Sequence, residues 1–457
     1  MQLLRPLLRQ SLSPIVIATA LAVIAPRASH AEARLVIEAD SGKVIEAENA
    51  TVPWYPASVT KLMTAYVTLS AVKSGKVTLD TLLTVSPTAA SQSPSKMGFK
   101  PGTAVTVDNA LKMMLVKSAN DMAVVLAEGV GGSIDGFSVM MNEAAQRLGM
   151  TQTHYVNPNG LPADEQVTSA RDLAILARAI IKDLPEYEYF VHIPSIRFGR
   201  RITQNFNRLI GRYPGADGFK TGFICASGYN LVASATRDGR RLIAVVLGAS
   251  SGTMRAVRAA QLLDRGFANN GLAWLRPSLG SVNNLVPIDA SPPNLRDEVC
   301  GGKHHRPSDD DDAPIVSSAA GSAGETGANG TVFLAAGLKP PMPKPSEWLA
   351  ANPAPSEPVV VYTGPTRTGA ALVAAVAADS DSQMTRRGKR PRVGARREAA
   401  AEAKPDARQP AAVRHASAKP ETAAKAATAP GKPAAAKSAA KPKAAPRSSS
   451  SGGKPAG

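Results

Sequence analysis

Short apolar runs separated by turn residues predict two β-hairpins within residues 32–275, one near each end. The first covers residues 35–44, where apolar residues flank an Asp-Ser-Gly turn. The second covers residues 229–249, where an Arg-Asp-Gly turn joins a strand-like run to a strongly apolar one. Because both ends of this region supply strands, we expect one sheet that both ends complete.

Between and after the hairpins, apolar residues recur at the spacing of helices that bury one face. Asp108 is the predicted cap of one helix, Gly149 the predicted end of another, and Ser169 opens a segment that resembles a capping box. Strands first and last predict an α+β fold, with a central antiparallel sheet flanked by helices and a helical lobe to one side. The expected helices cover residues 58–72, 108–115, 133–148, 169–181 and 252–267.

Three short motifs follow one another in this region: Ser58-Val59-Thr60-Lys61, Ser118-Ala119-Asn120 and Lys220-Thr221-Gly222. Each motif alone is weak evidence, because S-x-x-K recurs at residues 70–73 and 93–96. The second motif starts 60 residues after the first, and the third starts 102 residues after the second. This order and these gaps make the combination informative.

The first motif has the residues of an activated serine nucleophile. Ser58 opens a helix, so Lys61 lies one turn further along the same face, within reach of the hydroxyl. A serine hydroxyl is a poor nucleophile until a base takes its proton, and a lysine can do so only when it is neutral. Burial and a second cation, for which Lys220 is the candidate, would favour that form. An isolated S-x-x-K would be better explained as a helix cap beside a surface lysine.

The motifs and their neighbours resemble the serine D-Ala-D-Ala carboxypeptidases among the low-molecular-mass penicillin-binding proteins. The matching segments are Pro-Ala-Ser-Val-Thr-Lys-Leu-Met-Thr at residues 56–64, Lys-Ser-Ala-Asn-Asp-Met-Ala at 117–123, Asp-Gly-Phe-Lys-Thr-Gly-Phe at 217–223 and Ala-Ser-Gly-Tyr-Asn-Leu at 226–231. The resemblance spans about residues 33–275. It implies the penicillin-binding and β-lactamase-like fold, with the active site between the sheet and the helical lobe.

The resemblance implies roles for the residues of the first two motifs. Ser58 would be the nucleophile and Lys61 its base. Ser118 would relay a proton between these residues and the leaving amine. The side-chain amide of Asn120 would hold the substrate backbone.

The third motif would bind the end of the substrate. Lys220 and Thr221 would bind a terminal carboxylate by charge and hydroxyl, and Gly222 would leave room for a substrate backbone beside the strand. The main-chain N–H groups of Ser58 and Phe223 would form the oxyanion hole. The resemblance implies no metal and no organic cofactor.

The implied reaction removes the terminal D-Ala from peptidoglycan stem peptides through an acyl-enzyme on Ser58, which penicillins would also acylate. A DD-endopeptidase that cleaves cross-links would use the same residues, and Phe223, which replaces a His of some carboxypeptidases, leaves this choice open. A class A β-lactamase needs Glu-x-x-Leu-Asn, which Glu-Gln-Val-Thr-Ser at residues 165–169 does not match. A non-catalytic wall-binding protein is disfavoured, because every catalytic position is intact.

Residues 1–31 have the pattern of a cleavable signal peptide. Arg5 and Arg9 precede a 12-residue apolar stretch, and small residues at 29–31 would place cleavage before Glu32. The alternative is an uncleaved membrane anchor, for which the stretch is short compared with the ~20 residues of a span. Export and the resemblance together predict a periplasmic location.

The last third of the chain has a different composition and lies outside the resemblance. Residues 276–383 are rich in Pro, Gly and Ser, and predict a mostly disordered linker. Residues 384–457 predict a disordered basic tail, since 18 Lys and Arg from Arg386 onward face 4 Asp and Glu and supply most of the formal charge of +17. Export argues against a nucleic-acid partner. Anionic lipid headgroups or acidic envelope polymers fit better, and a solvated tail without a partner stays open.

The chain has two cysteines, Cys225 just after the third motif and Cys300 in the expected linker. An oxidising compartment permits a disulfide between them, and two independent thiols are equally consistent with the sequence. The pair His304-His305 precedes four aspartates, but the spacing matches no defined metal site. A solvated polar linker is the better interpretation of that segment.

Overall fold

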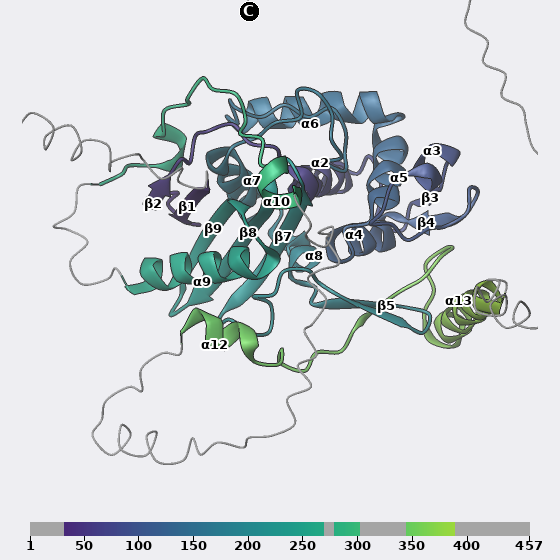
Figure 1. Ribbon diagram of the computed structural model, residues 1–457. Coiled ribbons are helices and arrows are strands. Elements are labelled where there is room, and N and C mark those ends of the chain that lie inside the picture. The colour runs from purple at the N-terminus through teal and green to yellow at the C-terminus, as the bar shows by residue number, and fades with distance from the viewer. Residues whose placement is uncertain (1–31, 269–277, 302–343, 389–457) are drawn as a thin grey trace, which may run out of the picture. The chain divides into compact units, whose positions relative to one another are not determined.

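A five-stranded antiparallel sheet forms the centre of the structure, a computed structural model that describes residues 32–268, 278–301 and 344–388. The strand order is β2-β1-β9-β8-β7, so the first strands of the chain pair with later ones, as the two hairpins predict (Figure 1). The α+β fold with one central sheet is therefore confirmed. The strands are β1 (Ala33–Glu38), β2 (Val44–Glu48), β7 (Ala216–Ile224), β8 (Gly228–Arg237) and β9 (Arg240–Ala249).

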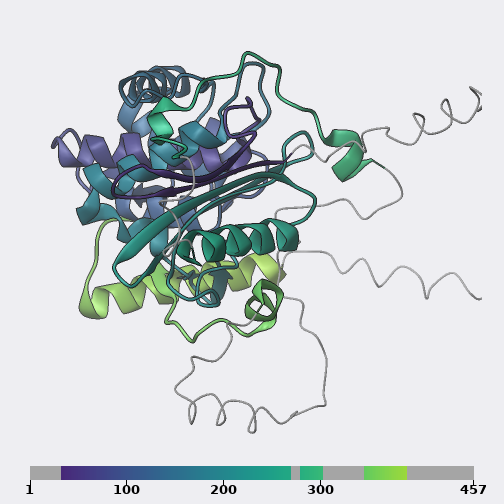
Figure 2. The ribbon, with the colours of Figure 1, turned by 90° about the vertical axis from the view of Figure 1, so that its left-hand side faces the viewer.

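Helices cover both faces of this sheet and form a lobe beside it (Figures 1 and 2). All five predicted helices are present. The larger ones are α2 (Lys61–Lys73), α4 (Val107–Val116), α5 (Asn120–Gly131), α6 (Ile134–Arg147), α7 (Ala170–Asp183) and α9 (Gly252–Ala268). Shorter elements are η1 (Ala57–Thr60), β3 (Leu82–Thr84), α3 (Pro87–Ser91), β4 (Ala104–Thr106), η2 (Pro185–Tyr187) and α8 (Tyr189–His192).

The strands alternate between two hydrophobic clusters because successive side chains point to opposite faces of a sheet. On β9, Ile243 and Val245 join the large cluster that includes α2 and α7. Their neighbours Leu242 and Ala244 join a second cluster with α9. The sheet therefore separates two cores, and a shift of one residue in register would exchange them.

Most predicted helix ends are confirmed, but the cap at Asp108 is wrong. Thr106 caps α4 instead, and its hydroxyl accepts a hydrogen bond from the Asn109 N–H at 3.2 Å. Thr106 has an extended backbone at the end of β4, from which a side chain can reach back to the helix. Asp108 already lies in the first helical turn. Ser169 does cap α7 by accepting from the Asp172 N–H.

Two stretches of the expected linker contain described elements. Residues 278–301 include η4 (Val282–Asn284) and α10 (Arg296–Cys300), and a disulfide joins Cys300 to Cys225. In the second stretch, residues 344–388, α12 (Pro345–Ala350) packs against α9 and α13 (Gly369–Gly388) continues past the expected boundary at residue 383. The disulfide, which the sequence left open, is thus the arrangement that the structure contains.

The strand β10 shows why the composition of residues 276–383 did not predict the elements found there. β10 (Val359–Val361) pairs in parallel with β5 (Ser195–Phe198), which also pairs with β6 (Arg201–Gln204). A strand of three residues has too few positions to show alternation. Its pairing partner also lies far back in the sequence, where a local pattern gives no sign of it.

Three predictions concern residues outside those that the structure describes: the signal peptide at 1–31, the polar segment around His304-His305, and residues 389–457 of the basic tail. Among the described residues, no single helix is both long and apolar enough to cross a membrane. The bent pair of α5 and α6 passes that test by length and composition when the two are combined. Most of α5 is buried in the protein core, as expected for a core helix.

A cluster of ionic side chains holds the start of β7 against α8. The Arg241 guanidinium on β9 forms ion pairs with Glu188, next to α8, and with Asp217 on β7, the latter at 3.2 Å. His192 lies 3.1 Å from the Glu188 carboxylate. Burial raises the pKa of Glu188, but the hydrogen bond from His192 and the charge of Arg241 outweigh burial and hold that pKa below its ordinary value.

The lowered pKa of Glu188 predicts a contribution to stability that depends on pH. This contribution is present above the unfolded-state pKa of about 4.3 and is lost as the pH falls through the lower folded-state value. We expect Glu188→Gln to lower the free energy of unfolding at pH 7, with a loss that shrinks toward about pH 3. Urea denaturation across this range measures the effect, with exposed Glu143→Gln as the control. A loss that is the same at every pH would contradict the electrostatic explanation.

Candidate active site

The nucleophile candidate lies on η1, which leads directly into α2. Ser58 is only 9% exposed, and Lys61 is completely buried. The Lys61 Nζ lies 2.9 Å from the Ser58 Oγ, within hydrogen-bond distance, as the three-residue spacing predicts. The first turn is a 3₁₀ turn rather than α-helix, and this brings the two side chains to the same side.

Lys61 also contacts carbonyl oxygens of two other segments. Its Nζ lies 2.7 Å from the Asn120 Oδ1 and 2.6 Å from the main-chain oxygen of Asn159. Because neither oxygen carries a hydrogen, each must receive one from the lysine. A neutral amine can give its two hydrogens to these oxygens and direct its lone pair at Ser58. The arrangement therefore suits a lysine that removes the proton of the Ser58 hydroxyl.

The second motif stands at the start of α5. Asn120 accepts from Lys61 and donates through its Nδ2 to the Ser93 main-chain oxygen at 2.9 Å, which fixes the orientation of its amide. Ser118 is 1% exposed, and its hydroxyl has no hydrogen-bond partner among the residues that the structure describes. A buried hydroxyl without a partner costs stability, so the Ser118 hydroxyl can bind a group that the described residues do not supply.

The segment that contains Ser93 is held to the second motif by Asp121. The Asp121 carboxylate accepts hydrogen bonds from the N–H groups of Met97 at 3.0 Å and Gly98 at 2.8 Å. Burial raises the pKa of Asp121, while these backbone donors oppose the rise. Asn120 also donates its own N–H to the Ser95 oxygen at 2.8 Å. Contacts with main-chain atoms thus hold residues 93–98 against the start of α5, opposite the nucleophile.

The third motif lies on β7, at the edge of the sheet. Lys220 and Thr221 are 1% and 3% exposed, and the Lys220 Nζ donates to the Thr221 main-chain oxygen at 2.9 Å. A Cβ at Gly222 would lie 2.9 Å from the main-chain nitrogens of Ser58 and Val59. Gly222 therefore lets β7 approach the nucleophile turn closely, which is a different reason for glycine from the room for substrate that the sequence indicated.

Two residues that the sequence analysis gave no role position these motifs. Asn230 on β8, opposite Gly222, donates its Nδ2 to the main-chain oxygens of Tyr55 and Pro56 at 3.0 and 3.2 Å. Arg255 on α9 is 2% exposed and donates to the Gly222 oxygen at 3.4 Å. Asn230 falls within the Ala-Ser-Gly-Tyr-Asn-Leu segment, so its position could have drawn attention, whereas nothing marked Arg255.

The loop of residues 156–166 is the largest contribution that the sequence analysis missed. It supplies the Asn159 oxygen to Lys61, and the Pro158 oxygen accepts from the Thr64 hydroxyl on α2 at 2.6 Å. Gln166 fixes the loop by accepting from the Val156 and Asn157 N–H groups at 2.7 and 3.1 Å. The Asn-Pro-Asn-Gly sequence could have been noticed as a turn. However, the loop contacts Lys61 and Thr64 through main-chain oxygens. Every residue has such an oxygen, so the residue types do not indicate these contacts.

A residue with a side chain adopts a left-handed backbone at each of the three motifs. These residues are Ala57 with φ 48°, Ser118 with φ 59° and Phe219 with φ 77°. Such a conformation costs roughly 1–2 kcal/mol for a residue other than glycine. It persists where the surroundings hold it, and it is concentrated at functional sites. Asn49, Glu165 and Asp238 also have positive φ values but lie outside the motifs, so these values support the site that the motifs indicate without defining it.

The other two S-x-x-K segments do not form such a pair. Lys73, at the end of α2, forms an ion pair with Glu186 at 3.1 Å on the surface. Lys96 donates its Nζ to the Ala90 main-chain oxygen at 2.9 Å. Both lysines are thus used in structural contacts.

A family model described as D-alanyl-D-alanine carboxypeptidase matches residues 19–251. The chain belongs to this family. It is 40% identical to D-alanyl-D-alanine carboxypeptidase DacC of Escherichia coli over 52% of this chain and 61% of that protein. It is 34% identical to DacB2 of Mycobacterium tuberculosis over 55% of this chain and 86% of that protein. The predicted family is therefore confirmed.

Solved structures of carboxypeptidases and penicillin-binding proteins have the same fold. The D-alanyl-D-alanine carboxypeptidase DacD of Francisella tularensis matches with a TM-score of 0.51 and 33% identity, over 52% of this chain and 70% of that one. Penicillin binding protein 6B of Escherichia coli matches with a TM-score of 0.50 and 36% identity, over 53% and 78%. The chain spans about three fifths of the length of the first curated relatives that it matches.

Gly160 offers a test of how closely the 156–166 loop packs on the nucleophile turn of this carboxypeptidase family member. A Cβ there would lie 1.8 Å from the Ala57 oxygen, whereas one at Gly149, which has a similar positive φ, would meet nothing within 4 Å. We expect Gly149→Ala to cost about 1–2 kcal/mol through its backbone alone. We expect Gly160→Ala to cost at least a further 1–3 kcal/mol through overpacking, as measured by urea denaturation. Equal losses would contradict the close contact.

Proposed function

We propose that this protein is a serine DD-carboxypeptidase, which removes the terminal D-Ala from peptidoglycan stem peptides through an acyl-enzyme on Ser58. The observation that carries the proposal is the 2.9 Å contact between the Lys61 Nζ and the Ser58 Oγ in a chain of the carboxypeptidase family. The relatives that it resembles are themselves named D-alanyl-D-alanine carboxypeptidases.

In the acylation step, Lys61 takes the hydroxyl proton as the Ser58 Oγ attacks the penultimate D-Ala carbonyl. The main-chain N–H groups of Ser58 and Phe223 stabilise the oxyanion. The closeness of Gly222 to the Ser58 nitrogen supports this role, since it brings the end of the third motif next to that donor. Lys220 and Thr221 bind the terminal carboxylate, and Asn120 binds the substrate backbone.

The intermediate collapses when the C–N bond breaks and the leaving amine takes a proton, which passes from Lys61 through the Ser118 hydroxyl. Free D-Ala then departs, and the penultimate residue stays esterified to Ser58. In the second step a water molecule attacks this ester while Lys61 takes a proton from that water. The C–O bond to Ser58 then breaks as Lys61 returns the proton to the Ser58 Oγ, which restores the hydroxyl and the neutral lysine. Both steps thus use the same base.

Penicillins act as covalent inhibitors in this proposal. A β-lactam presents a reactive amide and a nearby carboxylate, so Ser58 attacks it as it attacks D-Ala-D-Ala. Penicillin binding protein 5 of Haemophilus influenzae, which is 36% identical and has a TM-score of 0.50, supports this part by its name. The same acylation also provides an assay of the nucleophile that needs no peptide.

The proposal places the reaction in a bacterial periplasm, after export by the signal peptide at residues 1–31. Charge alone supports a contact between the basic tail, residues 384–457, and anionic lipids or acidic envelope polymers. Deletion of this tail tests the contact by fractionation of cells. An unchanged distribution between the soluble and envelope fractions would remove it.

The reaction is tested on the mature chain, residues 32–457, with a pentapeptide that ends in D-Ala-D-Ala and a cross-linked muropeptide dimer. We expect loss of one alanine from the pentapeptide, detected by mass spectrometry, while the dimer stays intact. Ser58→Ala should abolish the release, and Ser70→Ala, from the other S-x-x-K on α2, should leave it unchanged. Cleavage of the dimer with little alanine release would make the protein a DD-endopeptidase instead.

The relay role of Ser118 predicts opposite effects on stability and activity. Because its hydroxyl is buried without a described partner, Ser118→Ala should leave the free energy of unfolding unchanged or raise it by about 1 kcal/mol. Alanine release should fall by about 10²–10⁴-fold, the usual contribution of proton transfer. Ser138→Ala is the matched control, since it removes a hydrogen bond of 2.8 Å to the Val156 oxygen and should destabilise the fold by about 1 kcal/mol. Full activity of Ser118→Ala would refute the relay.

A further inference from the structure

Two neighbouring residues, Gln92 and Ser93, contact both of the asparagines that accept hydrogen bonds from Lys61. The Gln92 Oε1 accepts a hydrogen bond from the Asn159 Nδ2 at 2.8 Å. The Ser93 main-chain oxygen accepts one from the Asn120 Nδ2 at 2.9 Å. Asn120 and Asn159 in turn supply the oxygens, at 2.7 and 2.6 Å, that receive hydrogens from the Lys61 Nζ. Residues 92–93 therefore connect the start of α5 to the 156–166 loop through both partners of the base.

Lys61 contacts the peptide unit between Asn159 and Gly160, and hydrogen bonds hold this unit at both ends. Its oxygen accepts from the Lys61 Nζ, and its N–H, which belongs to Gly160, donates to the Asn157 Oδ1 at 2.8 Å. The Asn159 side chain is held in the same way, because its Oδ1 accepts from the Leu161 N–H at 3.0 Å and its Nδ2 donates to Gln92. Asn159 is only 3% exposed, so its polar groups need these partners.

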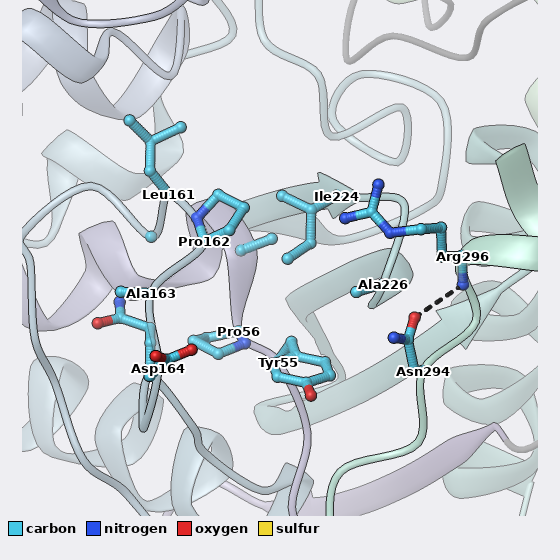
Figure 3. Close-up of a pocket in the computed structure, with 13 residues that line it drawn as sticks. Tyr55, Pro56, Leu161, Pro162, Ala163, Asp164, Ile224, Ala226, Asn294 and Arg296 are labelled. Carbon is cyan, nitrogen blue, oxygen red and sulfur yellow. Dashed lines mark hydrogen bonds between the residues drawn. The ribbon is translucent and has the colours of Figure 1, made fainter. Parts of the chain in front are cut away.

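On one side, packing does not hold the residues that follow Asn159, because a cavity lies there. Residues 160–164 line a pocket of about 260 Å³ beside the nucleophile turn, and Ile224 and Ala226 line it as well (Figure 3). Atoms that border a cavity lack packed neighbours on that side and lose the corresponding dispersion contacts. The position of the Asn159 oxygen therefore depends strongly on hydrogen bonds, including the one to Gln92.

The helix α3 holds Gln92 in place from the other end of its side-chain amide. Gln92 follows the last residue of α3, and its Nε2 donates to the Thr88 main-chain oxygen at 3.2 Å. Ser86 caps this helix, and its hydroxyl donates to the Glu128 carboxylate on α5 at 3.0 Å. Because the Nε2 is bound to α3, the Oε1 has a fixed place at Asn159. A glutamine that served only to end the helix would turn this oxygen to solvent instead.

We propose that Gln92 is a positioning residue for the base: through Asn159, it keeps the lone pair of Lys61 directed at Ser58. This inference rests on the proposed function, in which Lys61 takes a proton in both steps of the reaction. A neutral amine that gives its two hydrogens to Asn120 and Asn159 has one orientation left for its lone pair. If the Asn159 oxygen shifts, the amine can turn, and its lone pair is less often in line with the Ser58 hydroxyl.

The test measures kcat and KM for alanine release from the pentapeptide by the mature chain, and the rate at which benzylpenicillin acylates Ser58. Gln92→Leu removes the acceptor for Asn159 at a similar side-chain size. We expect kcat and the acylation rate each to fall about tenfold, which corresponds to the loss of one hydrogen bond. KM should change by less than about twofold, because acylation and deacylation use the same base and slow together. Gln92→Glu keeps an oxygen for Asn159 and should restore both rates to within about threefold.

A double-mutant cycle shows whether Gln92 acts through Asn159. Asn159→Ala removes the amide that Gln92 contacts, so in that background Gln92→Leu should change kcat by less than about twofold. Gln146→Leu, at an exposed glutamine on α6, is the matched control and should leave kcat, KM and the acylation rate unchanged. Gln92 is only partly buried, so its variants should fold, which urea denaturation checks.

The possible results separate this inference from the proposed function. Full activity of Gln92→Leu, or the same tenfold loss with and without the Asn159 side chain, would overturn the positioning role. A raised KM with an unchanged kcat would also overturn it, since Gln92 would then act on substrate binding. If the unaltered chain releases no alanine, the carboxypeptidase reaction is overturned, while the acylation rates still decide whether Gln92 positions the base. Neither release nor acylation by the unaltered chain would overturn both.

Discussion

The burial of Lys61 is the constraint on which the arrangement of the site depends. A lysine with no exposed surface needs acceptors, because an amine taken out of water without hydrogen bonds is costly. The hydrogen-bond partners come from three segments: Ser58 in the preceding turn, Asn120 at the start of α5, and Asn159 in the 156–166 loop. Each segment must be placed accurately, so the nucleophile turn, the start of α5 and the 156–166 loop all have to meet at one nitrogen atom. The rest of the site serves this convergence.

Close backbone contacts provide the necessary accuracy. Gly222 and Gly160 approach the nucleophile turn from opposite partners, β7 and the loop, at distances that a Cβ would prevent. Asn230 ties the residues before Ser58 to β8. Because β7, β8 and the 156–166 loop all contact the nucleophile turn, they can maintain the left-handed backbone of Ala57. Rigidity in the surroundings thus keeps a local conformation that would not persist alone.

The sequence was sufficient where a function depends on residue types at fixed spacing. The pairing of Ser58 with Lys61 was predicted in this way, and apolar runs separated by turn residues predicted both hairpins. It was insufficient where main-chain atoms act, as the Asn159 oxygen does, because any residue carries such an oxygen. It also failed at β10, where three residues pair with a distant strand. The choice between Cys225–Cys300 and free thiols depends on tertiary proximity, which local pattern does not report.

Residues inside and outside the family match come together at the end of β7. Ser58, Asn120 and Lys220 lie within residues 19–251, whereas Arg296 and Cys300 lie beyond it. Yet the disulfide and the Leu295 contact bring the later segment to the end of β7, one residue past Phe223. A change in residues 294–300 can therefore alter the surroundings of the end of β7 without altering Ser58, Asn120 or Lys220.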